Sequence, residues 1–135
     1  MARPRSPHPT EGELEILRVL WSEGPLELGA LREQLAAERG REIANTTVAT
    51  MLKVMEEKGF VKKAKGERSY RWSARVTRKK TSRGLVGRVV DKVFDGSAKG
   101  LVTHMIEDGR LSDADLAEIR ALLDANTEGR KGESS

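Results

Sequence analysis

A group of small hydroxyl, amide and basic side chains near the middle of the chain has the residue types that bind nucleic acid. They follow one another at helical spacing: Asn45, Thr46, Thr47, Thr50 and Lys53. Small hydroxyl side chains let a helix enter the major groove deeply, where they bond base edges or touch thymine methyl groups. The start of such a helix also offers free N–H groups to a phosphate. The pattern predicts a helix that reads DNA, although threonines in this position also serve as caps.

Cations follow this segment closely. Five of them occur within ten residues: Lys62, Lys63, Lys65, Arg68 and Arg71. The region from Arg41 to Arg83 holds thirteen lysines and arginines against four acidic residues, whereas the rest of the chain has more acidic than basic residues. Such a concentration of positive charge favours a polyanionic partner. We expect these side chains to contact phosphates, and the alternative for charge alone is a solvated lysine-rich surface.

Catalytic and metal chemistry is disfavoured by the composition. The chain has no cysteine, so it has no disulfide and no cysteine-ligated metal. Its two histidines, His8 and His104, stand alone without the spacing of a metal site or a triad, and no glycine-rich phosphate loop occurs. No apolar run reaches the about 18 residues of a membrane span. We expect a cytoplasmic protein that is not an enzyme, has no cofactor and does not insert into a membrane.

Apolar residues at helical spacing predict three helices in the first half of the chain. Thr10 and Glu13 form the capping-box pattern at the start of the first helix. A glycine ends each helix, at Gly24, Gly40 or Gly59. The expected helices cover about residues 10–23, 26–39 and 45–58, with Asn45 as the cap of the third. The expected inward stripes are Leu14, Ile16, Leu17, Leu20 and Trp21, then Leu28, Leu31 and Leu35, then Val48, Met51, Leu52 and Met55.

Two short β-like runs, Phe60–Lys65 and Ser69–Trp72, come next and are joined by a glycine-containing turn. They predict a β-hairpin. Tyr70 and Trp72 share one face of it, so we expect both to pack onto the helices. One further extended strand is expected through Ile43.

Three more helices are expected in the second half, at about residues 77–94, 97–107 and 112–126. Each is short and has an apolar face that a chain of this size cannot easily bury, which favours a homodimer. The alternative is that these helices dock onto the chain's own N-terminal domain. The residues expected in the dimer interface are Val86, Val89, Val90, Val93, Leu101, Val102, Met105, Leu116, Ile119 and Leu123.

Three stretches resemble the penicillinase-repressor family of the BlaI/MecI/CopY type. Leu14–Trp21 is similar to that family's first helix. Thr46–Phe60 is similar to its recognition helix, with the pattern T-x-x-T-x-L-x-x-L-x-x-K-G matched near Thr47, Thr50, Leu52, Met55, Lys58 and Gly59. The order Val93–Ser97, Leu101-Val102, Leu111-Ser112 and Leu116–Leu123 resembles its dimerisation region. The likeness covers about residues 9–126.

This resemblance implies a homodimer that binds a palindromic DNA operator, represses transcription and is controlled by a membrane metallopeptidase sensor or another protease. In the β-lactam-sensing branch an Asn–Phe bond in the fifth helix is cleaved, and the corresponding pair here is His104–Met105, the candidate cleavage region. The copper-sensing branch uses C-terminal cysteine pairs, which this chain lacks.

The sequence therefore predicts a mostly α protein with a small β-hairpin. The expected parts are a flexible arm (1–9), a winged helix-turn-helix DNA-binding domain (10–74), a helical dimerisation region (75–126) and a disordered tail (127–135). Two other functions stay open: a winged-helix module for protein–protein interaction, and a protein that coats DNA nonspecifically.

Overall fold

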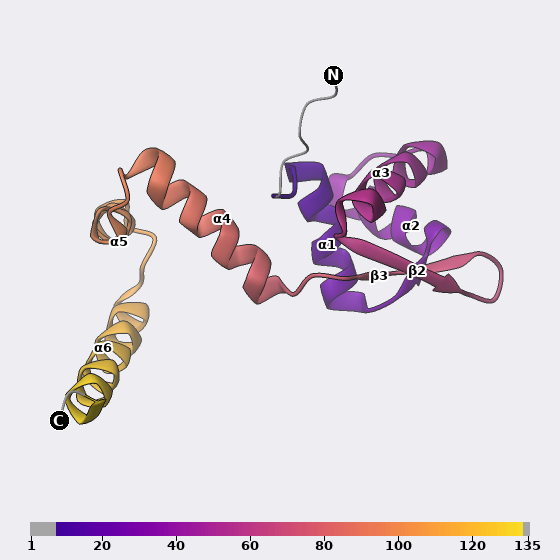
Figure 1. The fold of residues 1–135 in the computed structure, drawn as a ribbon. Helices are drawn as coiled ribbons and strands as arrows, with labels where there is room; N and C mark the ends of the chain where they lie inside the picture. Colours follow the sequence, from indigo (N-terminus) through magenta and orange to yellow (C-terminus); the bar gives the residue numbers. More distant parts are fainter. Residues whose placement is uncertain (1–7, 134–135) are drawn as a thin grey trace, which may run out of the picture. The chain divides into compact units, whose positions relative to one another are not determined.

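The computed structural model describes the backbone of residues 8–133 and the side chains of residues 8–129. The chain divides into two compact units, one up to Val86 and one from Gly87 onward (Figure 1). The elements of the first unit are α1 (Glu11–Glu23), β1 (Leu26–Glu27), α2 (Leu28–Arg39), α3 (Asn45–Lys58), β2 (Val61–Lys65) and β3 (Tyr70–Ala74). Helix α4 (Arg78–Val93) spans the division, and α5 (Ala98–Glu107) and α6 (Asp113–Glu133) belong to the second unit.

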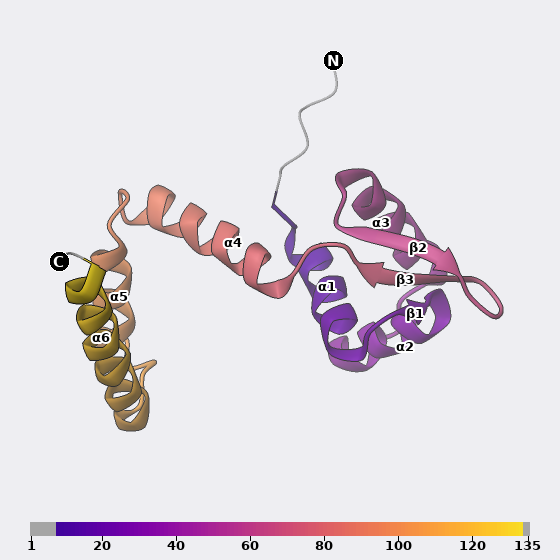
Figure 2. The same ribbon diagram turned by 60° about the horizontal axis from the view of Figure 1, so that its bottom comes forward.

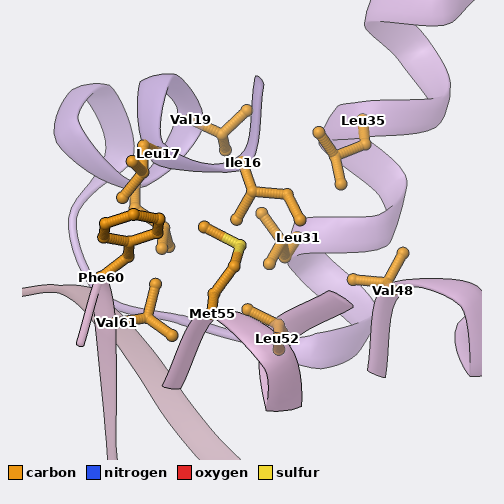
Figure 3. Close-up of a cluster of buried hydrophobic side chains, with 11 residues drawn as sticks. Ile16, Leu17, Val19, Leu31, Leu35, Val48, Leu52, Met55, Phe60 and Val61 are labelled. Atoms are coloured by element: carbon orange, nitrogen blue, oxygen red, sulfur yellow. The ribbon is translucent and has the colours of Figure 1, made fainter. Parts of the chain in front are cut away.

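The first unit is a winged helix-turn-helix. Its three helices pack around a core to which α1, α2, α3 and the start of β2 all contribute (Figure 3). The buried apolar residues are Ile16, Leu17, Val19, Leu20, Leu31, Leu35, Val48, Leu52, Met55, Phe60 and Val61. Burying one side chain of this size contributes about 1.5–3 kcal/mol. Most of the predicted inward residues are confirmed. Trp21, Leu28 and Met51 are only partly buried at the edge of this core, and Leu14 is partly buried outside it.

The sheet has three antiparallel strands in the order β1-β3-β2 (Figure 2). The predicted hairpin is confirmed, with Lys63 opposite Trp72 and Lys65 opposite Tyr70. The third strand is β1, in which Leu26 also pairs with Trp72. The strand expected through Ile43 is wrong, because that residue packs against the core from an irregular link. Helix α2 begins at Leu28 and not at Leu26, because Leu26 and Glu27 form strand β1.

Several helix ends follow the local sequence signals. The capping box of α1 is confirmed, since the Glu13 N–H donates to Thr10 Oγ1 at 3.2 Å and the Thr10 N–H donates to Glu13 Oε1 at 2.9 Å. Gly40 and Gly59 end α2 and α3 in the left-handed region, with φ of 66° and 84°. The prediction that Asn45 caps α3 is wrong. Ala44 takes the extended conformation of the cap, and Asn45 already lies in the first helical turn.

The second unit consists of helices that bury none of their described apolar side chains deeply. Ser97 caps α5, because its Oγ accepts the Gly100 N–H at 2.9 Å, and Ser112 with Asp115 forms the corresponding pair before α6. Helix α6 continues to Glu133, whereas a disordered tail was expected from residue 127. Polar residues without a proline let the helix run on. Of the expected arm, residues 1–7 lie outside the described residues. Within the described range, no helix is both long and apolar enough to cross a membrane.

Candidate nucleic-acid interface

Helix α3 presents the predicted polar residues on its outer side. Asn45, Thr46, Thr47, Thr50 and Lys53 are all exposed. They are exposed because Val48, Leu52 and Met55 occupy the opposite, buried side of the same helix. The polar side chains that sequence spacing predicted to face outward are thus exposed, four of them in the first half of α3 and Lys53 in the second half.

The hydroxyl of Thr50 is already engaged within the helix. Its Oγ1 donates to the carbonyl oxygen of Thr46 at 2.8 Å. This bond uses the hydroxyl proton, so the oxygen remains available only as an acceptor. Thr50 can therefore accept a hydrogen bond from a base amino group or make an apolar contact through its methyl group.

The N-terminus of α3 has no anionic cap. Ala44 provides no side-chain hydrogen bond, and the first turn contains no acidic residue. The partial positive charge at this helix end is therefore not offset by a carboxylate of its own first turn. It lies directly beside the exposed Asn45 and Thr46, where an approaching phosphate would meet both.

The β-hairpin of residues 61–74 is here called the wing. Hydrogen bonds connect the turn of the wing to Glu27 of β1. The Glu27 carboxylate accepts the Ser69 N–H and the Ser69 hydroxyl, each at 2.9 Å. The hydrogen bond from the Ser69 side chain is the main reason that the pKa of Glu27 lies below its ordinary value. Across the turn, the Gly66 N–H donates to the Ser69 carbonyl oxygen at 3.0 Å. These hydrogen bonds fix the turn of the wing relative to β1.

The five wing cations have different surroundings. All five are exposed, and the side chain of Lys63 is 39% exposed. The Nζ atom of Lys63 lies 4.6 Å from the ring centre of Tyr70 and 5.7 Å from that of Trp72. It also lies 3.9 Å from Oε1 of Glu56 on α3.

The two wing aromatics differ in burial. Trp72 packs against the core, as predicted. The prediction that Tyr70 does the same is wrong, because its side chain is 55% exposed. Tyr70 lies opposite Lys65, in the strand pair next to the hairpin turn, and the Lys63 ammonium lies over its ring.

A buried ion pair anchors the C-terminal end of α3 to α1. Lys58 Nζ donates to both carboxylate oxygens of Glu13 at 3.0 Å. The two side chains are only 11% and 6% exposed. Sequence reasoning assigned Glu13 to the capping box and missed this pair, because its members are 45 positions apart. An acidic residue on the edge of an apolar helix stripe is the one local signal that could have indicated it.

The structure places His104 on the surface of the second unit. His104 is exposed on α5, and its ring lies 5.9 Å from that of Phe94. Within the described residues, no group of three or more histidine, aspartate or glutamate side chains could hold a metal ion. His104 and Met105, the candidate cleavage region, both lie within α5.

Three helices followed by a basic β-hairpin define a winged-helix DNA-binding protein (Figure 1). The model of the Penicillinase repressor family matches residues 9–125. The chain therefore belongs to this family. It is a DNA-binding transcriptional repressor, as the family is, and not an enzyme.

Individual relatives have low sequence identity to this chain, but the alignments cover most of both proteins. The Penicillinase repressor of Staphylococcus aureus is 20% identical over 111 residues, which cover 82% of this chain and 86% of that protein. The Methicillin resistance regulatory protein MecI of Mammaliicoccus sciuri is 20% identical over 114 residues, which cover 84% and 91%.

Two solved structures are similar to this chain at comparably low sequence identity. RosR of H. salinarum, in the hsRosR-S4 complex, has a TM-score of 0.50 and 19% identity, covering 76% of this chain and 90% of that chain. The transcriptional regulator Tm0710 of Thermotoga maritima has a TM-score of 0.45 and 19% identity, covering 93% and 80%.

Proposed function

We propose that this repressor binds a palindromic operator as a homodimer, with α3 of each copy in the major groove and each wing against the phosphate backbone. The observation that carries the proposal is the exposed face of α3, held outward by the buried residues behind it and flanked by the wing cations. Polar residues of this size and a helix N-terminus suit base edges and an adjacent phosphate. The wing side chains proposed to contact phosphates are Lys62, Lys65, Arg68 and Arg71.

The base-reading role of α3 is tested by Thr50→Ala. We expect specific binding to weaken by roughly 1–3 kcal/mol while binding to unrelated DNA stays nearly unchanged. Thr127→Ala is a matched control, because Thr127 is also exposed on a helix and its hydroxyl donates to the Leu123 carbonyl at 2.9 Å in the same way. Equal losses in specific and nonspecific affinity would show that Thr50 does not read bases.

The salt dependence of binding separates this proposal from a winged helix used for protein contacts. A chain that neutralises several phosphates loses affinity steeply as salt rises, because counterions are released on binding. An affinity for duplex DNA that barely changes between low and moderate salt would contradict phosphate contact by the wing. A footprint without a discrete protected site would favour nonspecific coating instead.

The homodimer is supported by the apolar side chains that remain exposed in the second half of the chain. They include five residues of the expected interface, and Ile106 and Leu122 add two that the sequence analysis did not single out. The exposed members are Val86, Val89, Val93, Val102, Ile106, Leu122 and Leu123. A second copy would remove these side chains from water together. Of the other expected interface residues, Val90, Leu101, Met105, Leu116 and Ile119 are half-buried.

A substitution within this surface tests the dimer. Val93→Asp should convert the dimer to a monomer in sedimentation experiments and sharply weaken operator binding, because a charge would be buried in the interface. Lys99→Asp places the same residue on the exposed side of α5 and serves as control. A wild-type chain that sediments as a monomer at micromolar concentration would contradict the proposal and favour docking of these helices onto the chain itself.

Relief of repression by a membrane metallopeptidase sensor or another protease is the second part of the proposal. Its support is the position of His104 and Met105 on a ten-residue helix with no buried residue, which opens at low cost. Coexpression with such a peptidase should yield a fragment ending at His104, identified by mass spectrometry. A chain that stays intact while the peptidase is active would rule out this site.

A further inference from the structure

Lys63 differs from the other wing cations in what surrounds it. It shares a face of β2 with the buried Val61, and its cross-strand partner is Trp72. Its ammonium group lies over the rings of Tyr70 and Trp72 and beside the Glu56 carboxylate. Among the described residues, the remaining wing cations have no carboxylate within ion-pair distance.

The contacts of Lys63 join two parts of the DNA-binding surface. Tyr70 and Trp72 belong to the wing, whereas Glu56 lies in the C-terminal half of α3. A cation over two aromatic faces is attracted by both rings, and the nearby carboxylate adds an opposite charge. Lys63 therefore connects the wing to α3, because its ammonium group contacts two aromatic rings of the wing and a carboxylate of the helix.

We infer that Lys63 is a positioning residue that fixes the wing relative to α3, and that it is not one of the phosphate-neutralising cations. Its side chain is 39% exposed, but Glu56 at 3.9 Å and the two rings already attract its ammonium group, so a bound phosphate would compete with them. A fixed angle between the wing and α3 matters for sequence recognition. Backbone contacts by the wing set the position of the protein on the duplex, and α3 must reach the base edges from that same position. This inference rests on the proposed function.

Two glutamine substitutions on the same strand separate the two roles. Lys62 and Lys63 are neighbours in β2, and alternate residues of a strand point to opposite faces. Lys62→Gln should make the slope of log affinity against log salt concentration shallower by about 0.9, the value for one lost phosphate contact. Lys63→Gln should leave this slope unchanged and lower specific affinity about three- to tenfold, with little effect on a shuffled duplex.

The two roles of Lys63 predict opposite changes in DNA affinity for the Glu56→Gln variant. If Lys63 positions the wing through Glu56, the ratio of specific to nonspecific affinity falls in this variant, as it does in Lys63→Gln. If Lys63 instead contacts phosphate, removal of the competing carboxylate frees it, and specific affinity rises. Lys63→Arg keeps the charge and the ring contacts, so it should restore the specific-to-nonspecific ratio.

The experiment measures binding of these full-length variants to a duplex that the wild-type chain selects from a random pool, and to a shuffled duplex of the same composition. Nuclear magnetic resonance supplies a separate readout, because the two rings should shift the Lys63 side-chain protons upfield, and Tyr70→Leu should reduce this shift. An equal loss of salt slope in Lys62→Gln and Lys63→Gln would overturn the inference alone. A flat salt dependence of the wild-type chain would instead overturn the proposed function, and the inference with it.

Discussion

Replacing Lys58 by methionine removes the cation of the buried ion pair. The Glu13 carboxylate then stays buried without a counter-ion and with little access to water. Lys58 supplies two hydrogen bonds of 3.0 Å to this carboxylate, and the two side chains are only 11% and 6% exposed. After the change, Glu13 keeps the Thr10 N–H as a donor. Breaking a buried pair in this way costs about 3–5 kcal/mol. Because Glu13 keeps one partner, we expect a loss of about 3 kcal/mol in the free energy of unfolding.

Urea denaturation followed by tryptophan fluorescence measures this loss. Arg39→Met is the matched control, since the Arg39–Glu15 pair of 2.8 Å is partly exposed and should contribute at most about 1 kcal/mol. The double variant Glu13→Leu/Lys58→Met should recover most of the loss, because it removes both buried charges together. A cost of Lys58→Met no larger than that of Arg39→Met would refute the reasoning, as would a double variant less stable than Lys58→Met.

Two further predictions concern the wing. Gly66→Ala should distort the turn, because a Cβ atom there would press against the Ser69 carbonyl oxygen, and we expect weaker DNA binding. Gly29→Ala, where a Cβ atom meets open space, should leave binding unchanged, and equal binding by both variants would contradict the argument. The hydrogen bonds of Ser69 lower the pKa of Glu27, so their stabilisation is fully present above the ordinary carboxyl pKa and is lost as pH falls through the lowered value. In an acid titration the Ser69 amide resonance should follow this pKa, and it should not do so in Glu27→Gln.

Local signals located the three helices of the first unit, although not the start of α2 or the cap of α3. The capping box at Thr10 and the glycines after α2 and α3 act within one helical turn, so short sequence windows contain them. Strand β1 could not be predicted in this way. Its two residues form a strand only because Trp72, far along the chain, pairs with Leu26. Asn45 was misassigned because Ala44, with no capping side chain, takes the backbone conformation of the cap.

The candidate site was predictable where it depends on the position of a residue in one helix. The exposed face of α3 follows from the apolar spacing of Val48, Leu52 and Met55. The distinct surroundings of Lys63 and the exposure of Tyr70 depend on strand register and on packing against α3, which composition does not reveal. The Glu13–Lys58 pair depends in the same way on how α1 and α3 meet.

Selection of bound duplexes from a random DNA pool, followed by footprinting of the enriched sequence, tests the central claim most directly. A repressor that reads bases through α3 as a homodimer should enrich one two-fold symmetric sequence and protect it as a discrete site. Binding to that site should weaken steeply with salt. A pool that stays random after repeated rounds, or protection spread evenly along the duplex, would contradict the account.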